Sequence, residues 1–273
     1  MNNLIIENIH ETLNFKLFKK VYYEILVPCF PDPEDHISWR YIKNMAKKSF
    51  YNPNENKQIM ISVSKQILPD GSEKPISFFL GAYYKKSQTG LISYMGMREN
   101  CEGLSASNIQ KQVLIEMQAE AQRFNQNLNA VFSLVDLPEY ANSQYITLPP
   151  IKRIMIMERN GASHIPIGFQ YPMFKTKIPF LKRKISYQSD VALLGYKLNG
   201  ILPTQSPQII KNFLDDFYTS YGINPKNDTA VIKMKKEIEA MPLGIDVKLS
   251  KKYRKNKNKT SNHSMSTLTT KSA

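Results

Sequence analysis

A buried strand, a turn of small residues and an amphipathic helix follow one another between Gly90 and Asn127. Leu91–Arg98 (LISYMGMR) is apolar and bounded by polar residues, which is typical of a buried strand. Glu102–Ser107 (EGLSAS) predicts a turn. The helix beyond it has an apolar face at four-residue spacing, made by Ile109, Val113, Met117 and Ala121. Because the first turn of a helix has backbone N–H groups without intrahelical partners, this unit predicts binding of a phosphate-bearing cofactor.

The order of the predicted elements indicates a mixed sheet with helices on both faces. Strands are expected over residues 4–9, 57–68, 76–85, 91–98, 130–136, 169–174 and 191–198. Helices are expected over residues 15–25, 37–50, 108–127, 151–160 and 207–221, the second of them capped by Asp35 or Ser38. Three adjacent strands in the middle imply hairpins, and the strand–helix–strand step after them implies a parallel crossover. We therefore expect an α/β fold of the mixed α+β kind.

Positive charge divides the chain into a body and a tail. The net charge is +14, and residues 246–273 carry half of it, with eight basic residues against one Asp. The body up to residue 245 is only mildly basic. Residues 250–273 have too few large apolar side chains to offset their ordering entropy, so we expect 246–273 to be a disordered basic tail. We assign 1–224 to one domain and 225–245 to an amphipathic helical extension.

The tail and the remaining composition limit the classes of partner. The tail predicts contact with an acidic partner, an anionic lipid or nucleic acid, and a solubilising or docking role is the alternative. No apolar run approaches the ~20 residues that span a bilayer. The two cysteines and the isolated His36 and His164 have no ligand spacing, so we expect no metal. The acidic first residues argue against a signal peptide, which favours the cytoplasm, with secretion through a C-terminal signal left open.

Four short motifs and their order resemble the GCN5-related N-acetyltransferase (GNAT) superfamily over about residues 4–222. The motifs are Val27–Glu34 (VPCFPDPE), Leu91–Tyr94 (LISY), Gly161–Ala162 and Phe213–Tyr218 (FLDDFY). The similarity is greatest to bacterial members with a Pro-x-Phe-Pro turn and a Leu-x-Ser-Tyr strand. The resemblance implies a mostly antiparallel sheet of about six to seven strands. It also implies that the central strand splays from its neighbour and that the cofactor is acetyl-CoA or coenzyme A.

The resemblance assigns the cofactor to two segments. The pantetheine arm is expected on the backbone of the strand, and the pyrophosphate on the loop and first helical turn. The residues concerned are Met95, Gly96, Met97, Gly103, Leu104, Ser105, Ala106, Ser107 and Asn108. The loop departs from the family pattern, with Glu102 in place of Arg or Gln and with Ser105 and Ser107 in place of Gly. Met157 occupies the position at which many members have a Tyr that protonates the leaving thiolate.

Aminolysis of a thioester needs a base for the ammonium and donors for the developing oxyanion. Backbone N–H groups at residues 95–97 are candidates for the donors. Asp136 and Glu99 are candidates for the base, and the Tyr94 hydroxyl could reach the acceptor. As alternatives, Asp136 caps the next turn, Glu99 is a solvated loop carboxylate and the ring of Tyr94 is core. The carboxylates expected to select a cationic acceptor are Glu34, Asp35 and Glu139.

Three functions remain open from the sequence. The first is an acyl-CoA-dependent N-acyltransferase that acts on a small amine or a protein lysine by direct attack on the thioester. The second is a catalytically degenerate protein of this fold that engages a partner through its cleft and basic tail, which Glu102, Ser105, Ser107 and Met157 favour. The third is a basic binding protein whose pattern converges on that of the family.

Overall fold

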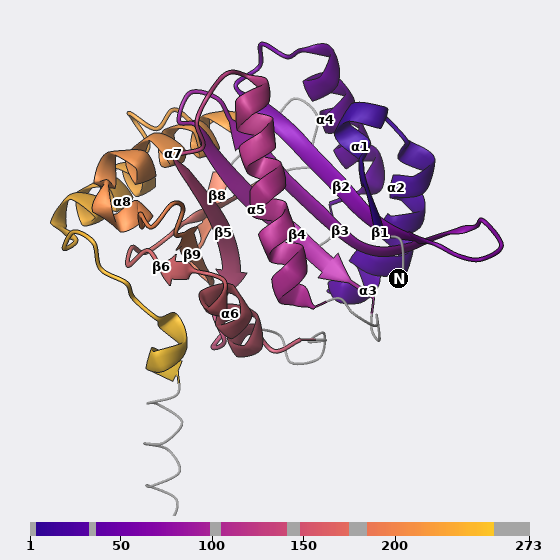
Figure 1. Ribbon diagram of the computed structural model, residues 1–273. Helices are drawn as coiled ribbons and strands as arrows, with labels where there is room; N and C mark the ends of the chain where they lie inside the picture. The colour runs from indigo at the N-terminus through magenta and orange to yellow at the C-terminus, as the bar shows by residue number, and fades with distance from the viewer. Residues whose placement is uncertain (1–3, 33–36, 99–104, 141–147, 175–184, 254–273) are drawn as a thin grey trace, which may run out of the picture.

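A seven-stranded sheet forms the centre of the computed structural model, which describes residues 4–32, 37–98, 105–140, 148–174 and 185–253 (Figure 1). Its strand order is β1-β2-β3-β4-β5-β9-β6. The strands are β1 (Leu4–Asn8), β2 (Lys57–Ile67), β3 (Glu73–Tyr84), β4 (Thr89–Met97), β5 (Ala130–Asp136), β6 (Ala162–His164) and β9 (Val191–Tyr196). The pair β4–β5 is parallel and the other neighbours are antiparallel. The predicted mixed, mostly antiparallel sheet with a parallel crossover is therefore confirmed.

Helices cover both faces of this sheet (Figure 1). One face carries α1 (Ile9–Thr12), α2 (Phe15–Val21), the π-helix η1 (Tyr22–Leu26), α3 (Val27–Cys29), α4 (Trp39–Tyr51), α7 (Pro207–Ser220) and α8 (Thr229–Ala240). The other face carries α5 (Ala106–Arg123) and α6 (Pro150–Arg159). A two-stranded sheet of β7 (Tyr171–Phe174) and β8 (Ile185–Gln188) and the short 3₁₀ helix η4 (Pro203–Gln205) complete the described elements.

Side-chain caps fix where the longer helices begin. The hydroxyl of Ser38 accepts a hydrogen bond from the backbone N–H of Tyr41 and begins α4, which selects one of the two predicted caps. Ser105 caps α5 in the same way through the N–H of Asn108. Both serines supply an acceptor to a helix turn whose donors lack intrahelical partners.

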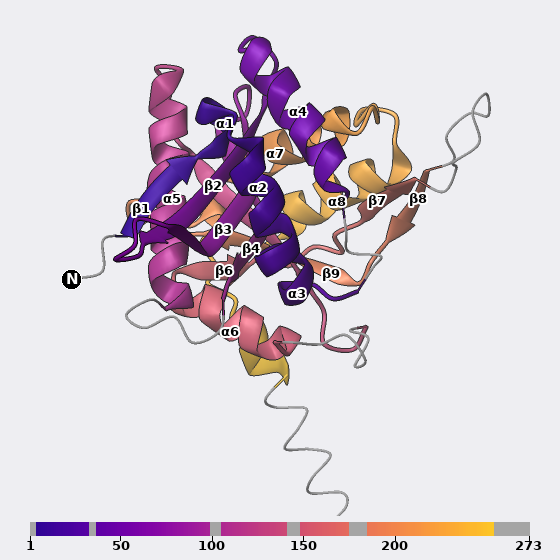
Figure 2. The same cartoon turned by 90° about the vertical axis from the view of Figure 1, so that its right-hand side faces the viewer.

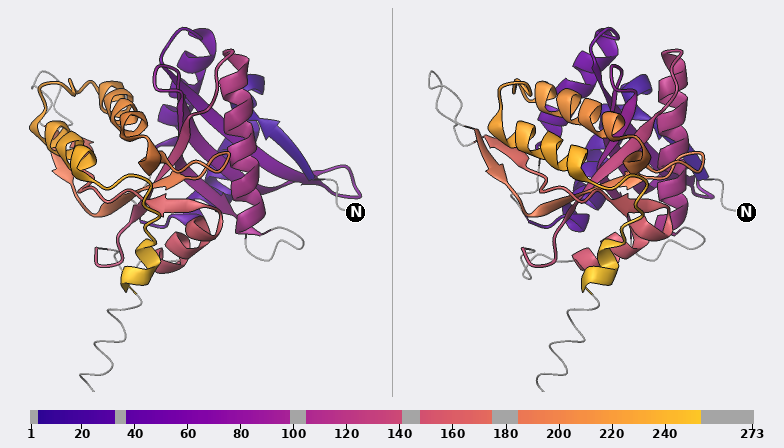
Figure 3. Two further views of the ribbon diagram at one scale, coloured as in Figure 1. Left: turned by 60° about the vertical axis from the view of Figure 1, so that its left-hand side comes forward. Right: turned by 90° about the vertical axis from the view of Figure 1, so that its left-hand side faces the viewer.

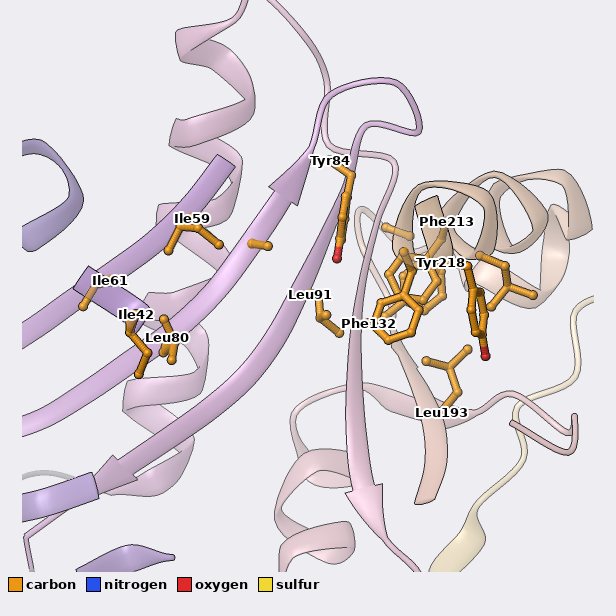
Figure 4. Close-up of a cluster of buried hydrophobic side chains, with 14 of the residues drawn as sticks. Ile42, Ile59, Ile61, Leu80, Tyr84, Leu91, Phe132, Leu193, Phe213 and Tyr218 are labelled. Carbon is orange, nitrogen blue, oxygen red and sulfur yellow. The ribbon is translucent and has the colours of Figure 1, made fainter. Parts of the chain in front are cut away.

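Aromatic side chains fill the larger core, between the sheet and α7. Phe132 of β5 stacks on Phe213 of α7 with ring centroids 4.2 Å apart, and Tyr84 meets Phe213 edge to face at 6.0 Å. Leu91 and Leu193 lie beside this cluster (Figure 4). Each such pair adds attraction beyond its buried area. The periodic positions Ile210, Phe213, Leu214 and Phe217 that predict α7 are all fully buried.

The C-terminal part of the chain departs from the predicted boundaries. The expected extension contains α8, whose residues Val231, Met234 and Ile238 are buried. The predicted start of the tail at residue 246 is wrong, because 246–253 pack on the body. The N–H of His164 donates to the carbonyl of Val247 at 2.9 Å, and Leu249 is only 3% exposed. Figure 3 shows this segment running from α8 to α6. It covers the edge of β6, which would otherwise present unpaired backbone groups.

Two short strands, β6 and β8, are absent from the sequence predictions because three or four residues carry too little periodicity. Among the described residues, no helix is both long and apolar enough to cross a membrane.

Candidate functional site

The strands β4 and β5 diverge at the centre of the sheet. Their parallel pairing covers Thr89–Ile92 of β4 and Ala130–Ser133 of β5, and it stops there although both strands continue. Residues 95–97 of β4 still pair with β3, while their other backbone edge forms no ladder with β5. An open strand edge can hydrogen-bond an extended ligand as if it were another strand. The splayed central strand implied by the resemblance is present.

A β-bulge at Ser93 accounts for the divergence. Leu80 pairs with Tyr94 and Gly81 with Ile92, so Ser93 is an extra residue in β4. A bulge bends its strand and increases the local twist, which turns the end of β4 away from β5. Gly81 is required opposite the bulge, because a Cβ there would collide with the backbone carbonyl of Leu91.

The end of β4 presents different side chains to the two faces of the sheet. Tyr94 packs with the α2–α4 and α7 side, where its ring meets Phe30 edge to face at 5.1 Å. Met95 and Met97 pack with the α5–α6 side. Gly96 points toward Cys29, since a Cβ at Gly96 would lie 3.0 Å from the Cys29 sulfur and 2.7 Å from the ring of Phe78. The turn after α3 therefore contacts β4 on the side of Tyr94.

The first turn of α5 is tied to the end of α6. The hydroxyl of Ser107 donates to the side-chain oxygen of Asn160, whose amide donates to Gln110 at 2.6 Å. The amide of Gln110 in turn donates to the hydroxyl of Tyr196 in β9. The Ser107 hydroxyl thus donates its proton within the protein, and the cofactor role expected of Ser107 falls to its backbone N–H. Ser105, Ala106 and Asn108 are half-buried or exposed at this helix end.

Asp136, a candidate base, forms an ion pair at the end of β5. Its Oδ2 lies 2.9 Å from Nη1 of Arg153 in α6, and the two side chains are 41% and 26% exposed. The predicted alternative, a cap on the next turn, has no support among the hydrogen bonds of the described residues. An exposed pair of this kind contributes little to stability, so its main effect is to hold the carboxylate. Sequence reasoning missed Arg153, which follows Asp136 by a full loop and part of a helix.

Glu139 lies beside the C-terminal segment. Burial, reinforced by the nearby Glu139 carboxylate, raises the pKa of the Tyr253 hydroxyl. The predictions for Glu34, Asp35, Glu99, Gly103 and Leu104 lie outside the described residues. The structure places Tyr94 and Met95–Met97 on the part of β4 that is not paired with β5, Ser105–Asn108 at the start of α5, and Asp136 at the end of β5.

Met157 of α6, for which the resemblance predicts a hydroxyl donor, contacts Ser133 of β5. The hydroxyl of Ser133 lies 3.8 Å from its sulfur. Ser133 itself is fully buried. A thioether cannot donate a proton, so the described part of α6 offers no acid at this point.

Two further features were not predicted from the sequence. The first is Lys57, which is half-buried and whose amine lies 5.9 Å from the ring centroid of Tyr84 and 5.4 Å from that of Tyr221. Burial lowers the pKa of the Lys57 amine to about 8. A cavity of about 180 Å³ lies between α6 and the C-terminal segment and is lined by Met155, Glu158, Arg159, Lys248 and Ser250. None of the predicted site residues that the structure describes lines this cavity.

Comparison with known proteins gives structural likeness only. No family model and no curated protein matches the chain. Solved structures similar to it include a dodecameric spermidine N-acetyltransferase from Vibrio cholerae, with 10% identity over 74% of this chain and 95% of that one, TM-score 0.40. Another is PaiA N-acetyltransferase from Thermoplasma acidophilum in complex with coenzyme A, with 11% identity over 72% and 99%, TM-score 0.37. A third is Tetrahymena GCN5, with 12% identity over 73% and 98%, TM-score 0.37.

Sequence identities this low do not assign a role to any residue of this chain. The fold class rests on three features of this structure: the strand order, the single parallel pair and the bulge at Ser93. Together with the motifs of the sequence they define a GNAT-like fold. The fold by itself does not fix the activity.

Proposed function

We propose that the chain is an acyl-CoA-dependent N-acyltransferase that transfers an acyl group to an amine. The observation that supports the proposal best is the early end of the β4–β5 pairing, in the strand that precedes α5 along the chain. An open strand edge suits the amides of a pantetheine arm, and the N-terminus of an 18-residue helix suits a pyrophosphate.

The residues at the helix start fit such a cofactor in size and charge. Ser105, Ala106 and Ser107 are small, and no acidic residue lies in the first turn of α5. In this proposal the backbone of Met95–Met97 binds the pantetheine, and residues 103–108 bind the pyrophosphate. Acetyl-CoA supplies an acyl group activated as a thioester.

The proposal assigns to a carboxylate the proton that the acceptor ammonium must lose before its amine attacks the thioester. Asp136 is the first candidate, and because Arg153 contacts its Oδ2, the ammonium is assigned to Oδ1. Glu99, acting through a water, is the second. Glu34, Asp35 and Glu139 would attract the cationic acceptor, and the hydroxyl of Tyr94 would orient it. The acceptor is a small amine or a protein lysine.

Calorimetric titration with acetyl-CoA and coenzyme A tests the cofactor site. We expect a dissociation constant on the order of micromolar. Ser105→Asp is the informative variant, because Asp is as good a helix cap as Ser but brings a negative charge to the expected phosphate position. It should weaken binding at least about tenfold. Ser38→Asp makes the same change at the cap of α4 and should leave binding unaltered.

Either of two results would contradict the proposed site. One is the absence of binding heat with the folded wild-type chain, and the other is equal weakening by Ser38→Asp and Ser105→Asp. If coenzyme A binds, release of free thiol in the presence of diamines, polyamines and lysine peptides tests acyl transfer. Asp136→Asn should then lower the rate of transfer while coenzyme A affinity stays the same.

A second candidate is a binding protein of this fold that has lost catalysis. It is favoured by Met157, which lies against Ser133 where a proton donor is expected. Binding of coenzyme A without thiol release from any amine would support this candidate over the transferase.

A further inference from the structure

The excess positive charge of the body is concentrated on two adjacent helices. The segments of α2 and α4 contain seven cations and no carboxylate. The cations are Lys16, Lys19, Lys20, Arg40, Lys43, Lys47 and Lys48. Residues 1–245 carry a net charge of +7, so everything in the body outside these two helices sums to zero. We call this surface the α2–α4 face.

The two helices lie side by side and form an outer layer of the molecule (Figure 2). Their contact is visible in Lys43, whose amine lies 5.6 Å from the ring of Phe15, and in Lys19, which lies 5.3 Å from the ring of Trp39. The buried sides of both helices pack into the core through Leu17, Phe18, Ile42 and Ala46. The α2–α4 face therefore projects its cations away from the protein.

Six of the seven cations have no ion pair among the described residues, the exception being Lys48, which pairs with Glu55 at 3.0 Å. The nearby carboxylates have cations of their own, since Glu24 pairs with Arg98 and Glu73 with Lys65. Six like charges on one face repel one another, and no ion pair among the described residues reduces this repulsion. A negatively charged partner would reduce the repulsion between these cations.

Aromatic side chains surround these cations. Tyr41, Phe50 and Tyr51 of α4 are 58%, 41% and 68% exposed, and Tyr23 of η1 is 53% exposed. Trp39 is half-buried, with Lys19, Arg40 and Lys43 within 6 Å of its ring centroid. Protein surfaces that bind at the level of lipid headgroups typically combine exposed aromatic side chains with Lys.

We propose that the α2–α4 face docks on an anionic phospholipid bilayer. Six of the seven cations are Lys, a point charge that suits a fluid layer of headgroups, whereas bidentate phosphate recognition in nucleic acid favours Arg. The attraction is electrostatic, with the aromatic rings entering the headgroup layer. Docking would leave α5 and α6, on the opposite side of the sheet, facing the solvent.

Vesicle flotation with the full chain tests this proposal. We expect binding to phosphatidylcholine vesicles that contain phosphatidylserine, no binding to pure phosphatidylcholine, and loss of binding as salt is raised. The variant Lys16→Glu/Lys20→Glu/Lys47→Glu reverses three exposed charges without an ion pair and should weaken binding at least about tenfold. The matched control, Lys86→Glu/Lys226→Glu/Lys233→Glu, reverses three exposed lysines on other elements and should bind like the wild type.

Because all variants keep the Lys-rich C-terminal residues, a contribution from that segment cancels in the comparison. Lys16→Gln/Lys20→Gln/Lys47→Gln removes the same charges without adding carboxylates, and its binding should fall between those of the wild type and the Glu variant. Thermal melting establishes that each variant is folded. The proposal is overturned if the wild type ignores phosphatidylserine, if the Gln variant binds like the wild type, or if duplex DNA or single-stranded RNA displaces the protein from vesicles at equal phosphate concentration.

Discussion

Asn160, the residue after α6, donates its side-chain amide to Gln110 of α5 at 2.6 Å. The same amide reaches the carbonyl of Ile156 at 2.9 Å, and its oxygen accepts from Ser107. Gln110 is fully buried and depends on Asn160 and Tyr196 for its hydrogen bonds. A single amide therefore joins the first turn of α5 to the end of α6.

Asn160→Ala should lower the free energy of unfolding by about 1–3 kcal/mol, because it leaves the buried oxygen of Gln110 without a donor. Asn212, which accepts from Gln208 on the exposed side of α7, offers the matched control. Asn212→Ala should change stability by less than about 0.5 kcal/mol. Urea unfolding of the two variants measures the difference, and equal effects would show that the network at Asn160 is unimportant.

Leu249 tests whether the C-terminal segment belongs to the body. Its side chain is 3% exposed, so Leu249→Ala should cost about 2–4 kcal/mol through lost burial and the cavity that remains. Leu243 lies just before it in the chain but is 69% exposed. Leu243→Ala should be almost neutral. A melting temperature as high in Leu249→Ala as in Leu243→Ala would mean that the segment detaches in solution.

Lys57 makes stability depend on alkaline pH. Burial lowers its pKa from 10.5 to about 8, so the unfolded chain binds more protons than the folded one between these values. The contribution of Lys57 to the free energy of unfolding should therefore increase as pH rises from 8 to 10.5. Lys57→Met, which keeps most of the alkyl chain, should remove the rise. Denaturant midpoints at three pH values in this window provide the measurement, and an unchanged slope in the variant would exclude Lys57 as its source.

His164 produces a dependence of the same sign in acid. Burial, with a smaller effect of Lys252, lowers its pKa from 6.5 to about 4. The unfolded chain again binds more protons, here between pH 4 and 6.5, so stability should fall as pH drops through this window. His164→Gln cannot take up the proton and should lose less stability than the wild type between pH 6.5 and 4. Parallel losses in the two proteins would assign the acid sensitivity to other groups.

Much of the central unit could be predicted because its signals are local. The spacing of Ile109, Val113, Met117 and Ala121 marks the buried face of α5, and all four are buried in the structure. Ser38, one of the two caps predicted for α4, acts within three residues of itself, and Ser105 caps α5 over the same short range although the resemblance assigned it to the cofactor loop. Neighbouring strands in the sheet follow mostly from chain order, which supports the predicted hairpins.

The candidate site itself was only partly predictable, since its contacts join distant residues. Asp136 was identified from its place at a strand end, but its partner Arg153 depends on how α6 returns to β5. The polar residues Gln110 and Glu120 are buried on α5 because of neighbours that no spacing reveals. The cofactor predictions for residues 95–97 and 103–108, and the acceptor predictions, stay predictions that the titrations above would test.

The sequence by itself determined the total charge, and it determined most of the longer helices and strands because their signals lie a few positions apart. Only the tertiary structure decided that β4 leaves β5 after Ile92, that residues 246–253 cover the edge of β6, and that the cations of α2 and α4 meet on one face. These features depend on strand register and on packing between segments far apart in the chain. Their free energy comes from burial and hydrogen bonds that exist only after the whole sheet has formed.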